Sequence, residues 1–149
     1  MLPHRVFNQA DTQPNLWVWG LGTSGQVGDN TATTRSSPVQ VGALTTWSSV
    51  SAGYSHTAAV KTEGTLWAWG ANTSGQVGDN TAATQSSPVQ VGALTTWSSV
   101  SAGFAHTAAI KTNGTLWSWG YNASGLLGDN TVTNRSSPVQ VGALTTWSS

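Results

Sequence analysis

The sequence predicts an all-β protein, a β-propeller built from four-stranded antiparallel blades. Three observations support this fold class: a repeat with a period of 50 residues, four short strand-like segments in each repeat, and no segment with the apolar periodicity of a helix. Four antiparallel strands per repeat are typical of a propeller blade. The period is clearest in the tryptophans, which recur as Trp17, Trp67 and Trp117, as Trp19, Trp69 and Trp119, and as Trp47, Trp97 and Trp147.

Each repeat contains the same strands in the same order. "SPVQVG" (37–42) is a short strand that contains Pro38, a residue suited to the first position of a strand or to a sheet edge. "TWSSVSAG" (46–53) is a second strand that ends at glycine, and "HTAAVKTEGTLWAWG" (56–70) supplies two more as a hairpin. We therefore expect complete blades at about 36–70 and 86–120.

The turn of the hairpin predicts which side chains share a face of the blade. In one copy the turn is Asn-Gly at 113–114, which favours a two-residue turn with positive φ at both positions. Pairing outward from such a turn places Val60 opposite Trp67 and Ala58 opposite Trp69 on one face. The other face then carries small alanines, and a large face beside a small face suits blades that stack.

The repeats at 16–149 leave an incomplete piece at each end. Residues 136–149 contain only the first two strand patterns, so we expect a half-blade there. Residues 1–15 form a divergent segment, in which 4–9 is a candidate closing strand. Fewer than three blades cannot close a propeller ring, which usually has four to eight.

We therefore expect the ring to be completed by another copy of the chain. A head-to-tail homodimer would give six blades, and a larger assembly is the alternative form of this hypothesis. The competing interpretation is a segment of a longer repeat protein. The predicted inter-chain closing residues are Leu16, Trp17, Trp19, Trp147, Ser148 and Ser149.

Composition excludes several classes of function. Charged residues make up only 7% of the 149 residues, and the formal net charge is zero. No basic stripe is available for phosphates, so nucleic acid is not an expected partner. Without cysteine there is no thiolate metal site and no cysteine nucleophile. No apolar stretch approaches the ~20 residues of a membrane helix, and none has signal-peptide length, so membrane insertion is not expected.

Several strings together resemble the regulator-of-chromosome-condensation repeat. They are "VSAGYSHTAAV" (50–60), "VSAGFAHTAAI" (100–110), "WGANTSGQVGDNT" (69–81), "SPVQV" and "GTLWAWG", and the resemblance covers about 16–149. It implies a propeller, seven-bladed in typical members, which include guanine-nucleotide exchange factors and a secreted inhibitor of β-lactamase. A plant ultraviolet photoreceptor of this family carries Trp and Arg between the Gly and the His. Tyr54-Ser55 and Phe104-Ala105 occupy those positions here, which disfavours photoreception.

The individual residues favour structural roles. We expect His56 and His106, which the resemblance places after a glycine turn, to hydrogen-bond neighbouring backbone. One carboxylate per repeat is too few for Ca²⁺, so the aspartates of "GDNT" are interpreted as turn residues. The tryptophans are expected in the core, each N–H bonded to a carbonyl. The repeats differ from one another mainly in one long loop, which suggests partner contacts or unconstrained drift. The candidate contacts are Leu21, Arg35, Ala71, Gln85, Tyr121 and Arg135.

The main functional hypothesis is a non-enzymatic structural or binding propeller in a virion or extracellular assembly, which mediates protein–protein or host-surface attachment. Low charge and abundant Ser, Thr, Asn and Gly suit that setting, although a cytoplasmic location is an alternative. A soluble protein-binding module, like an exchange factor or an inhibitor, is the second hypothesis, and a glycan-binding propeller is the third. No acid pair, triad or metal constellation is visible, so we expect no cofactor and no catalysis.

Overall fold

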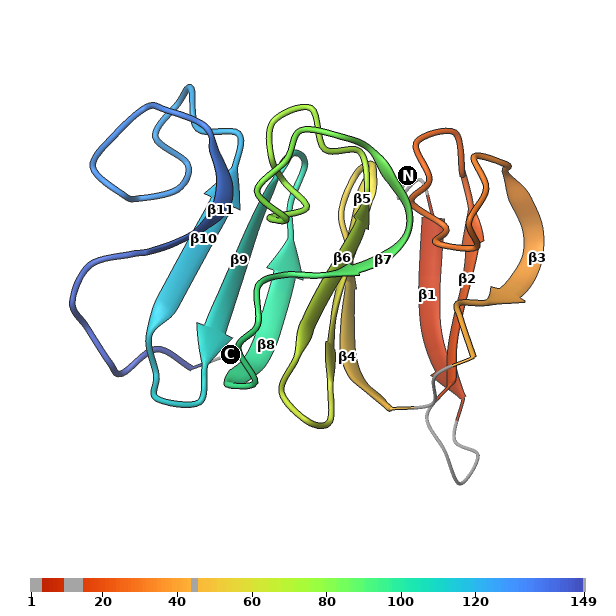
Figure 1. Cartoon of the computed structure of the whole chain (residues 1–149), viewed down its shortest axis with the longest axis horizontal. Helices are drawn as coiled ribbons and strands as arrows, with labels where there is room; N and C mark the ends of the chain where they lie inside the picture. The colour runs from red at the N-terminus through yellow and green to blue at the C-terminus, as the bar shows by residue number, and fades with distance from the viewer. Residues whose placement is uncertain (1–3, 10–14, 44–45, 149) are drawn as a thin grey trace.

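A computed structural model describes residues 4–9, 15–43 and 46–148, with residues 4–9 described by their backbone. These residues form eleven strands and no helix, arranged as three antiparallel sheets that lie side by side (Figure 1). Within this described part, no helix could cross a membrane. The all-β prediction is confirmed, and the sheets form part of a propeller.

The sheets follow one another along the chain. The first contains β1 (His4–Gln9), β2 (Asn15–Gly20) and β3 (Arg35–Gln40). The second contains β4 (Trp47–Ala52), β5 (His56–Lys61), β6 (Leu66–Gly70) and β7 (Gln85–Gln90). The third contains β8 (Trp97–Ala102), β9 (His106–Lys111), β10 (Leu116–Gly120) and β11 (Arg135–Gln140).

The grouping of strands into blades differs from the sequence prediction. The blades were expected at 36–70 and 86–120, but the hydrogen-bonded sheets span 47–90 and 97–140. The "SPVQ" strand pairs with the strand before it, across the long loop, and lies at the sheet edge, where its proline needs no hydrogen-bonding partner. The short link after the "SPVQ" strand leads to the first strand of the next sheet, whereas the sequence prediction placed those two strands in one blade.

The same change in how strands group into sheets alters the interpretation of both ends of the chain. Residues 136–149 are not a half-blade, because β11 completes the third sheet and the described residues beyond it contain no strand. At the other end, 4–9 forms β1, which pairs antiparallel with β2. The first sheet thus has three strands within the described residues, while the other two sheets have four. Ser149 lies outside the described residues.

The predicted hairpin register was wrong by one residue. Val60 lies opposite Leu66, and Ala59 lies opposite Trp67. The turn is longer than expected: the Gly64 N–H donates to the Lys61 carbonyl at 2.8 Å, and only the glycine has positive φ, at 81°. A type I turn followed by a left-handed glycine adds one residue to the loop, so the side chains on each face change partners.

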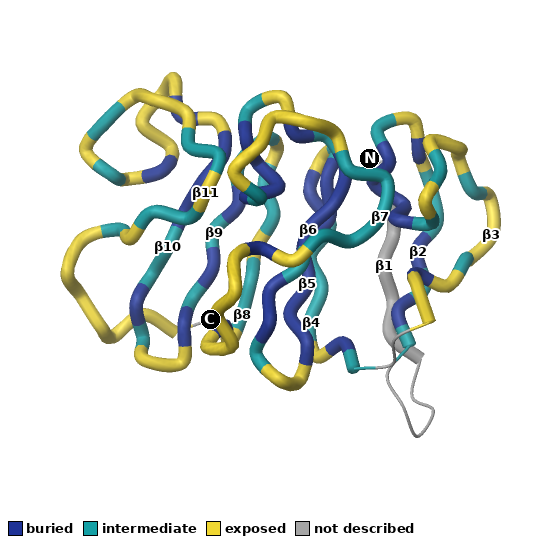
Figure 2. Tube along the Cα trace, in the orientation of Figure 1, coloured by how far each residue is buried: buried dark blue, intermediate teal, exposed yellow. Residues whose placement is uncertain are grey.

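The core consists of two layers between neighbouring sheets. Between the first and second sheets, Trp47 and Trp69 pack on Leu16, Val18 and aliphatic neighbours. The layer between the second and third sheets repeats this arrangement, with Trp97 and Trp119 against the small and aliphatic face of the second sheet. Figure 2 shows β5 and β6 of the middle sheet as mostly buried between their neighbours. In each layer, two tryptophans of one sheet therefore pack against aliphatic or small side chains of the sheet before it.

A buried lysine joins three strands within each of the two complete sheets. The Lys61 Nζ lies 4.0 Å from the centroid of the Trp67 ring and 5.1 Å from that of Trp47. Lys111 lies between the rings of Trp97 and Trp117 in the same way, at 4.9 and 3.5 Å. Burial lowers the pKa of both amines. The indole faces stabilise a cation that would otherwise be costly to bury.

Hydrogen bonds join the sheets through one backbone carbonyl. The Gln76 carbonyl, in the long loop between β6 and β7 of the second sheet, accepts from Trp119 Nε1 at 3.0 Å and from Thr107 Oγ1 at 2.7 Å, both in the third sheet. The Gln26 carbonyl does the same for Trp69 and Thr57, at 3.0 and 2.9 Å. The expectation of core tryptophans bonded to carbonyls is confirmed at Trp69 and Trp119. It is wrong at Trp67 and Trp117, which donate to threonine hydroxyls.

His56 belongs to the same network. Its ring is fully buried, and its Nε2 lies 3.0 Å from Thr107 Oγ1 in the next sheet. The Thr107 hydroxyl has one hydrogen, which it donates to the Gln76 carbonyl, so His56 Nε2 must carry the proton and donate. In this contact His56 meets a side chain of the neighbouring sheet, and the expected bond of His56 and His106 to neighbouring backbone stays a prediction.

Replacing Thr107 with valine tests this network. The variant keeps the shape of the side chain but removes the acceptor for His56 and one donor to Gln76. We expect the free energy of unfolding to fall by about 1–3 kcal/mol, measured by urea denaturation. The control is Thr112→Val, on an exposed turn, which should change it by no more than about 0.5 kcal/mol. Equal effects of the two substitutions would contradict the assignment.

Candidate protein-binding rim

One end of the three sheets carries all the long loops, and we call it the upper rim. It consists of the loops 21–34, 71–84 and 121–134 and the tight turns 53–55 and 103–105, at the top of Figure 1. Backbone hydrogen bonds join turn and loop: the Ala71 N–H donates to the Ser55 carbonyl, and the Tyr121 N–H to the Ala105 carbonyl, both at 2.8 Å.

Each long loop is organised around its aspartate. Asp129 accepts hydrogen bonds from Thr131 N and Oγ1, at 3.0 and 2.7 Å, and from Arg135 Nε at 2.8 Å. Asp79 receives the corresponding bonds from Thr81, and Gln85 replaces the arginine at 2.8 Å. Asp29 is bound in the same way. The carboxylates thus hold loop backbone, as the turn interpretation predicts.

These donors lower the pKa of the carboxyl groups. The hydrogen bonds from Thr131 and then Arg135 lower the pKa of Asp129 to about 2, from an ordinary value of 3.8. At Asp29 and Asp79, burial acts to raise the pKa, but the hydrogen bonds outweigh it and the net shift is also downward. Hydrogen bonds to the ionised form therefore keep all three carboxylates charged well into the acid range.

Three of the six candidate contact residues face their own loop. Arg35 donates through Nε to Asp29 at 2.6 Å, and Gln85 and Arg135 occupy the same place in the other loops. Their shared role explains why this position alternates between arginine and glutamine, since both supply a donor. Only about a third of the Arg35 side chain remains exposed for a partner.

A buried asparagine stabilises each of the second and third long loops, and the sequence analysis did not identify either residue. The Asn72 side chain donates to Asp79 and to the Thr81 and Ala83 carbonyls, and it accepts from Val77 N at 3.0 Å. Asn122 repeats this role in the third loop. In the first loop Gly22 takes the place of asparagine, and a Cβ there would meet the Thr33 carbonyl oxygen at 2.0 Å. The difference between copies was visible in the sequence, but not its structural cause.

The other three candidates lie at the start of their loops. Leu21 and Tyr121 are exposed, and Ala71 is half-buried. They occupy equivalent positions on successive sheets, so the first and third loops present an apolar or aromatic side chain where the second presents only a methyl group. The structure does not bring these three side chains into one cluster.

The largest aromatic surface on the upper rim is a stacked pair that the sequence prediction did not include. Tyr54 and Phe104 lie in the tight turns of the second and third sheets, and they are 52% and 69% exposed. Their ring centroids are 4.5 Å apart with an interplanar angle of 31°. The Tyr54 N–H donates to the Gly103 carbonyl at 3.1 Å, so the two turns are also joined through backbone.

The pair is positioned by the glycine and histidine on either side of it. A Cβ on Gly53 would lie 2.5 Å from the Gly103 carbonyl oxygen, so only glycine lets the two turns approach this closely. The histidine is anchored in the core by Thr107, and the aromatic residue two positions earlier is directed outward. The sequence did contain a signal, an aromatic residue between the glycine and the histidine of a Gly-x-x-His turn. The pattern does not tell, however, whether such a residue is buried or exposed.

No metal chemistry is indicated on the described part of the rim. Among the described residues, no three or more His, Cys, Asp or Glu side chains group in a way that could hold an ion. The aspartate oxygens bind loop donors instead, as set out above.

The pKa of Asp129 provides a test of the loop structure. Because the folded-state pKa is below the unfolded value, this group stabilises the fold above about pH 4 and loses that contribution as the pH falls toward 2. A carboxyl-carbon NMR titration should give a midpoint of about 2 for Asp129. Thr131→Val, which removes one donor, should raise it, while the exposed control Thr133→Val should not. A wild-type midpoint near 3.8 would contradict this arrangement.

Comparisons with known proteins agree with this architecture. The Regulator of chromosome condensation (RCC1) repeat matches residues 15–60, 63–110 and 113–148, and a second model of the same repeat matches 47–76 and 97–126. A search of curated protein sequences found no match for this chain.

Solved structures share the fold at low sequence identity. Prp20p from Saccharomyces cerevisiae, reported with its binding to Gsp1p and histones, superposes with a TM-score of 0.85 at 22% identity, over 95% of this chain and 36% of that one. Yeast RCC1 (Prp20) bound to Kap60 gives 0.83 at 23%, over 95% and 35%, and human WBSCR16 gives 0.79 at 21%, over 94% and 37%. The chain thus spans about a third of the length of these proteins. Since the repeat matches most of the sequence, the chain belongs to the RCC1 repeat family.

Proposed function

We propose that this chain is a protein-binding propeller module whose partner contacts the upper rim at Tyr54 and Phe104. One observation carries the proposal: two large aromatic side chains are exposed, stacked on each other and fixed by backbone on adjacent sheets. Aromatic anchors of this kind dominate binding energy at protein interfaces, because they bury a large area and lose little conformational entropy.

The relatives support a protein partner over other ligands. The structures of Prp20 concern its binding to Gsp1p, to histones and to Kap60. These partners are not assigned to this chain, which is 22–23% identical to those proteins and covers about a third of them. The soluble binding module, second among the hypotheses from sequence, is therefore favoured over a virion or extracellular component.

The electrostatics of the rim narrow the chemistry of the partner. The formal net charge is zero, and the three loop aspartates are bound by donors of their own loops. A strongly basic partner would find no uncompensated carboxylate in these loops, and an acidic partner would find no free cluster of arginines. We propose that the partner inserts an apolar or aromatic side chain against the Tyr54–Phe104 pair.

The remaining functional hypotheses stay predictions from composition. No observation on the described residues tests a virion or extracellular setting, attachment to a host surface, or glycan binding. The expectation of no catalysis also stays a prediction.

The double variant Tyr54→Ala/Phe104→Ala tests the proposal. The purified chain is immobilised, and proteins retained from an extract of the cells that express it are identified and then measured by titration calorimetry. Loss of two aromatic anchors should weaken the partner's Kd by about 30-fold or more, equivalent to about 2 kcal/mol. Because both side chains are exposed, the midpoint of thermal unfolding should change little.

The matched control removes apolar side chains from the opposite end of the sheets. Leu94 and Leu144 are 48% and 61% exposed, in the links that follow β7 and β11. Leu94→Ala/Leu144→Ala should leave the Kd unchanged. A partner that binds the rim variant as tightly as the wild type, or that is lost only with the control, would overturn the proposal.

A further inference from the structure

A side-chain hydrogen bond joins the first strands of the second and third sheets, β4 and β8, which pack against each other. The Ala102 N–H in β8 donates to Ser51 Oγ in β4 at 2.9 Å. Ser48, in the same strand as Ser51, bonds within its own sheet, because its Oγ donates to the Val60 carbonyl at 2.9 Å. The Ser51 hydroxyl therefore connects two sheets, whereas the Ser48 hydroxyl connects two strands of one sheet.

The register of the second sheet directs Ser51 toward the third sheet. Ser51 lies directly opposite Ala58, and residues that lie opposite each other in an antiparallel pair project from the same face. Ala58 is buried in the core layer between the second and third sheets. The residue type at position 51 therefore decides whether the Ala102 N–H finds an oxygen acceptor in that layer.

This bond lies next to the backbone bond that joins the two aromatic turns. Tyr54 follows Ser51 by three residues, and its N–H donates to the Gly103 carbonyl at 3.1 Å. Ala102, the donor to Ser51, directly precedes Gly103 and Phe104. The second sheet thus donates one of the two bonds and accepts the other. Together the bonds hold the turns at two points, whereas one bond alone would let one turn rotate against the other.

The relative orientation of the two turns determines whether the aromatic rings stack. The Tyr54 and Phe104 ring centroids lie 4.5 Å apart at an interplanar angle of 31°. Both side chains are exposed, so few surrounding side chains restrict the rings. The constraint on the stack therefore comes from the backbone below it, and Ser51 supplies one of the two bonds that align this backbone.

We infer that Ser51 is a positioning residue for the partner site on the upper rim. Its hydroxyl accepts from the Ala102 N–H, aligns the two turns and keeps the Tyr54 and Phe104 rings stacked before a partner arrives. This inference rests on the proposed function, because the partner contacts the pair that Ser51 aligns. A pair that is already aligned loses less conformational entropy on binding, so the hydroxyl raises affinity through the turns.

The first measurement uses the free chain. Nuclear Overhauser contacts between the ring protons of Tyr54 and Phe104 report the stack directly. Ser51→Ala removes the acceptor for Ala102 and should weaken or remove these contacts. Ser51→Thr keeps a hydroxyl and is β-branched, which suits a strand, so it should restore them.

The second measurement is the Kd of the protein that the wild-type chain retains in the capture experiment. Ser51→Ala should weaken this Kd by about 3- to 10-fold, the range expected when two side chains must be ordered on binding. Ser51→Thr should return it to the wild-type value.

Ser48→Ala is the matched control for loss of a serine hydroxyl. It removes one hydrogen bond to backbone from the same strand, as Ser51→Ala does, but that bond lies within one sheet. A general loss of stability would therefore be common to both variants. Ser48→Ala should keep the ring contacts and the wild-type Kd.

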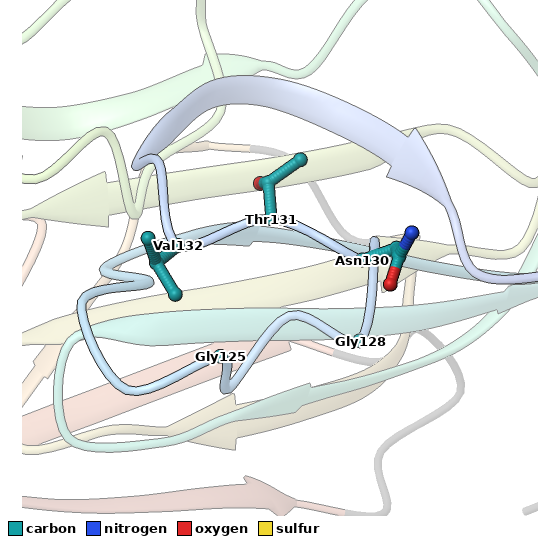
Figure 3. A pocket seen from close by; sticks show the side chains of 5 residues that line it. All are labelled: Gly125, Gly128, Asn130, Thr131 and Val132. Atoms are coloured by element: carbon teal, nitrogen blue, oxygen red, sulfur yellow. The ribbon is translucent and has the colours of Figure 1, made fainter.

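Val132→Ala is the control for loss of an apolar side chain elsewhere on the upper rim. Val132 is 68% exposed in the third long loop. Figure 3 shows it beside a hollow of about 590 Å³, which is also lined by Gly125, Gly128, Asn130 and Thr131. The substitution leaves β4 and both aromatic turns intact, so the ring contacts and the Kd should not change.

The two measurements separate failure of this inference from failure of the proposed function. Ring contacts that survive Ser51→Ala, that weaken equally in Ser48→Ala or that Ser51→Thr does not restore would overturn the inference. So would a Kd that Ser51→Ala leaves unchanged, or that Val132→Ala weakens equally, while Tyr54→Ala/Phe104→Ala weakens it. If Ser51→Ala removes the ring contacts but the double variant keeps the wild-type Kd, the proposed function fails.

Discussion

One buried carbonyl in each of the first two long loops connects one sheet to the next, and the rest of the structure depends on these contacts. Gln76 presents its carbonyl oxygen to the indole N–H of Trp119 and the hydroxyl of Thr107, both in the third sheet. That hydroxyl in turn accepts a hydrogen bond from His56 of the second sheet. A buried carbonyl left without donors is costly, so this contact fixes both the separation and the register of neighbouring sheets. Glycine is required beside it, because any Cβ would displace the indole.

This constraint separates structural positions from those free to bind. The loop aspartates, their threonines and the Arg or Gln at the start of the edge strand all maintain the loop that presents the carbonyl. Tyr54 and Phe104 do not contribute to that network, yet they are held rigidly because their turns are joined through backbone. An exposed aromatic pair on a rigid support is pre-organised for binding, which reduces the entropy lost on association.

The sequence predicted the fold class, the repeat, the strands and the core tryptophans, because periodicity and composition report burial directly. It did not predict where each blade begins and ends, since a tandem repeat reads the same from any starting strand. The hairpin register failed because Asn113-Gly114 suits two turn types that differ by one residue. The buried Asn72 and the exposed Tyr54 were also missed, because a side chain's environment in a loop depends on distant segments that local patterns do not contain.

Hydrogen exchange of the indole N–H groups, followed by NMR, tests the central contact most directly. Trp69 and Trp119 donate to buried carbonyls, whereas Trp67 and Trp117 donate to threonine hydroxyls at half-buried positions. The indole protons of Trp69 and Trp119 should exchange about tenfold or more slowly than those of Trp67 and Trp117, near the rate of global unfolding. Equal exchange rates for the two pairs would show that the loop carbonyls do not hold the sheets together.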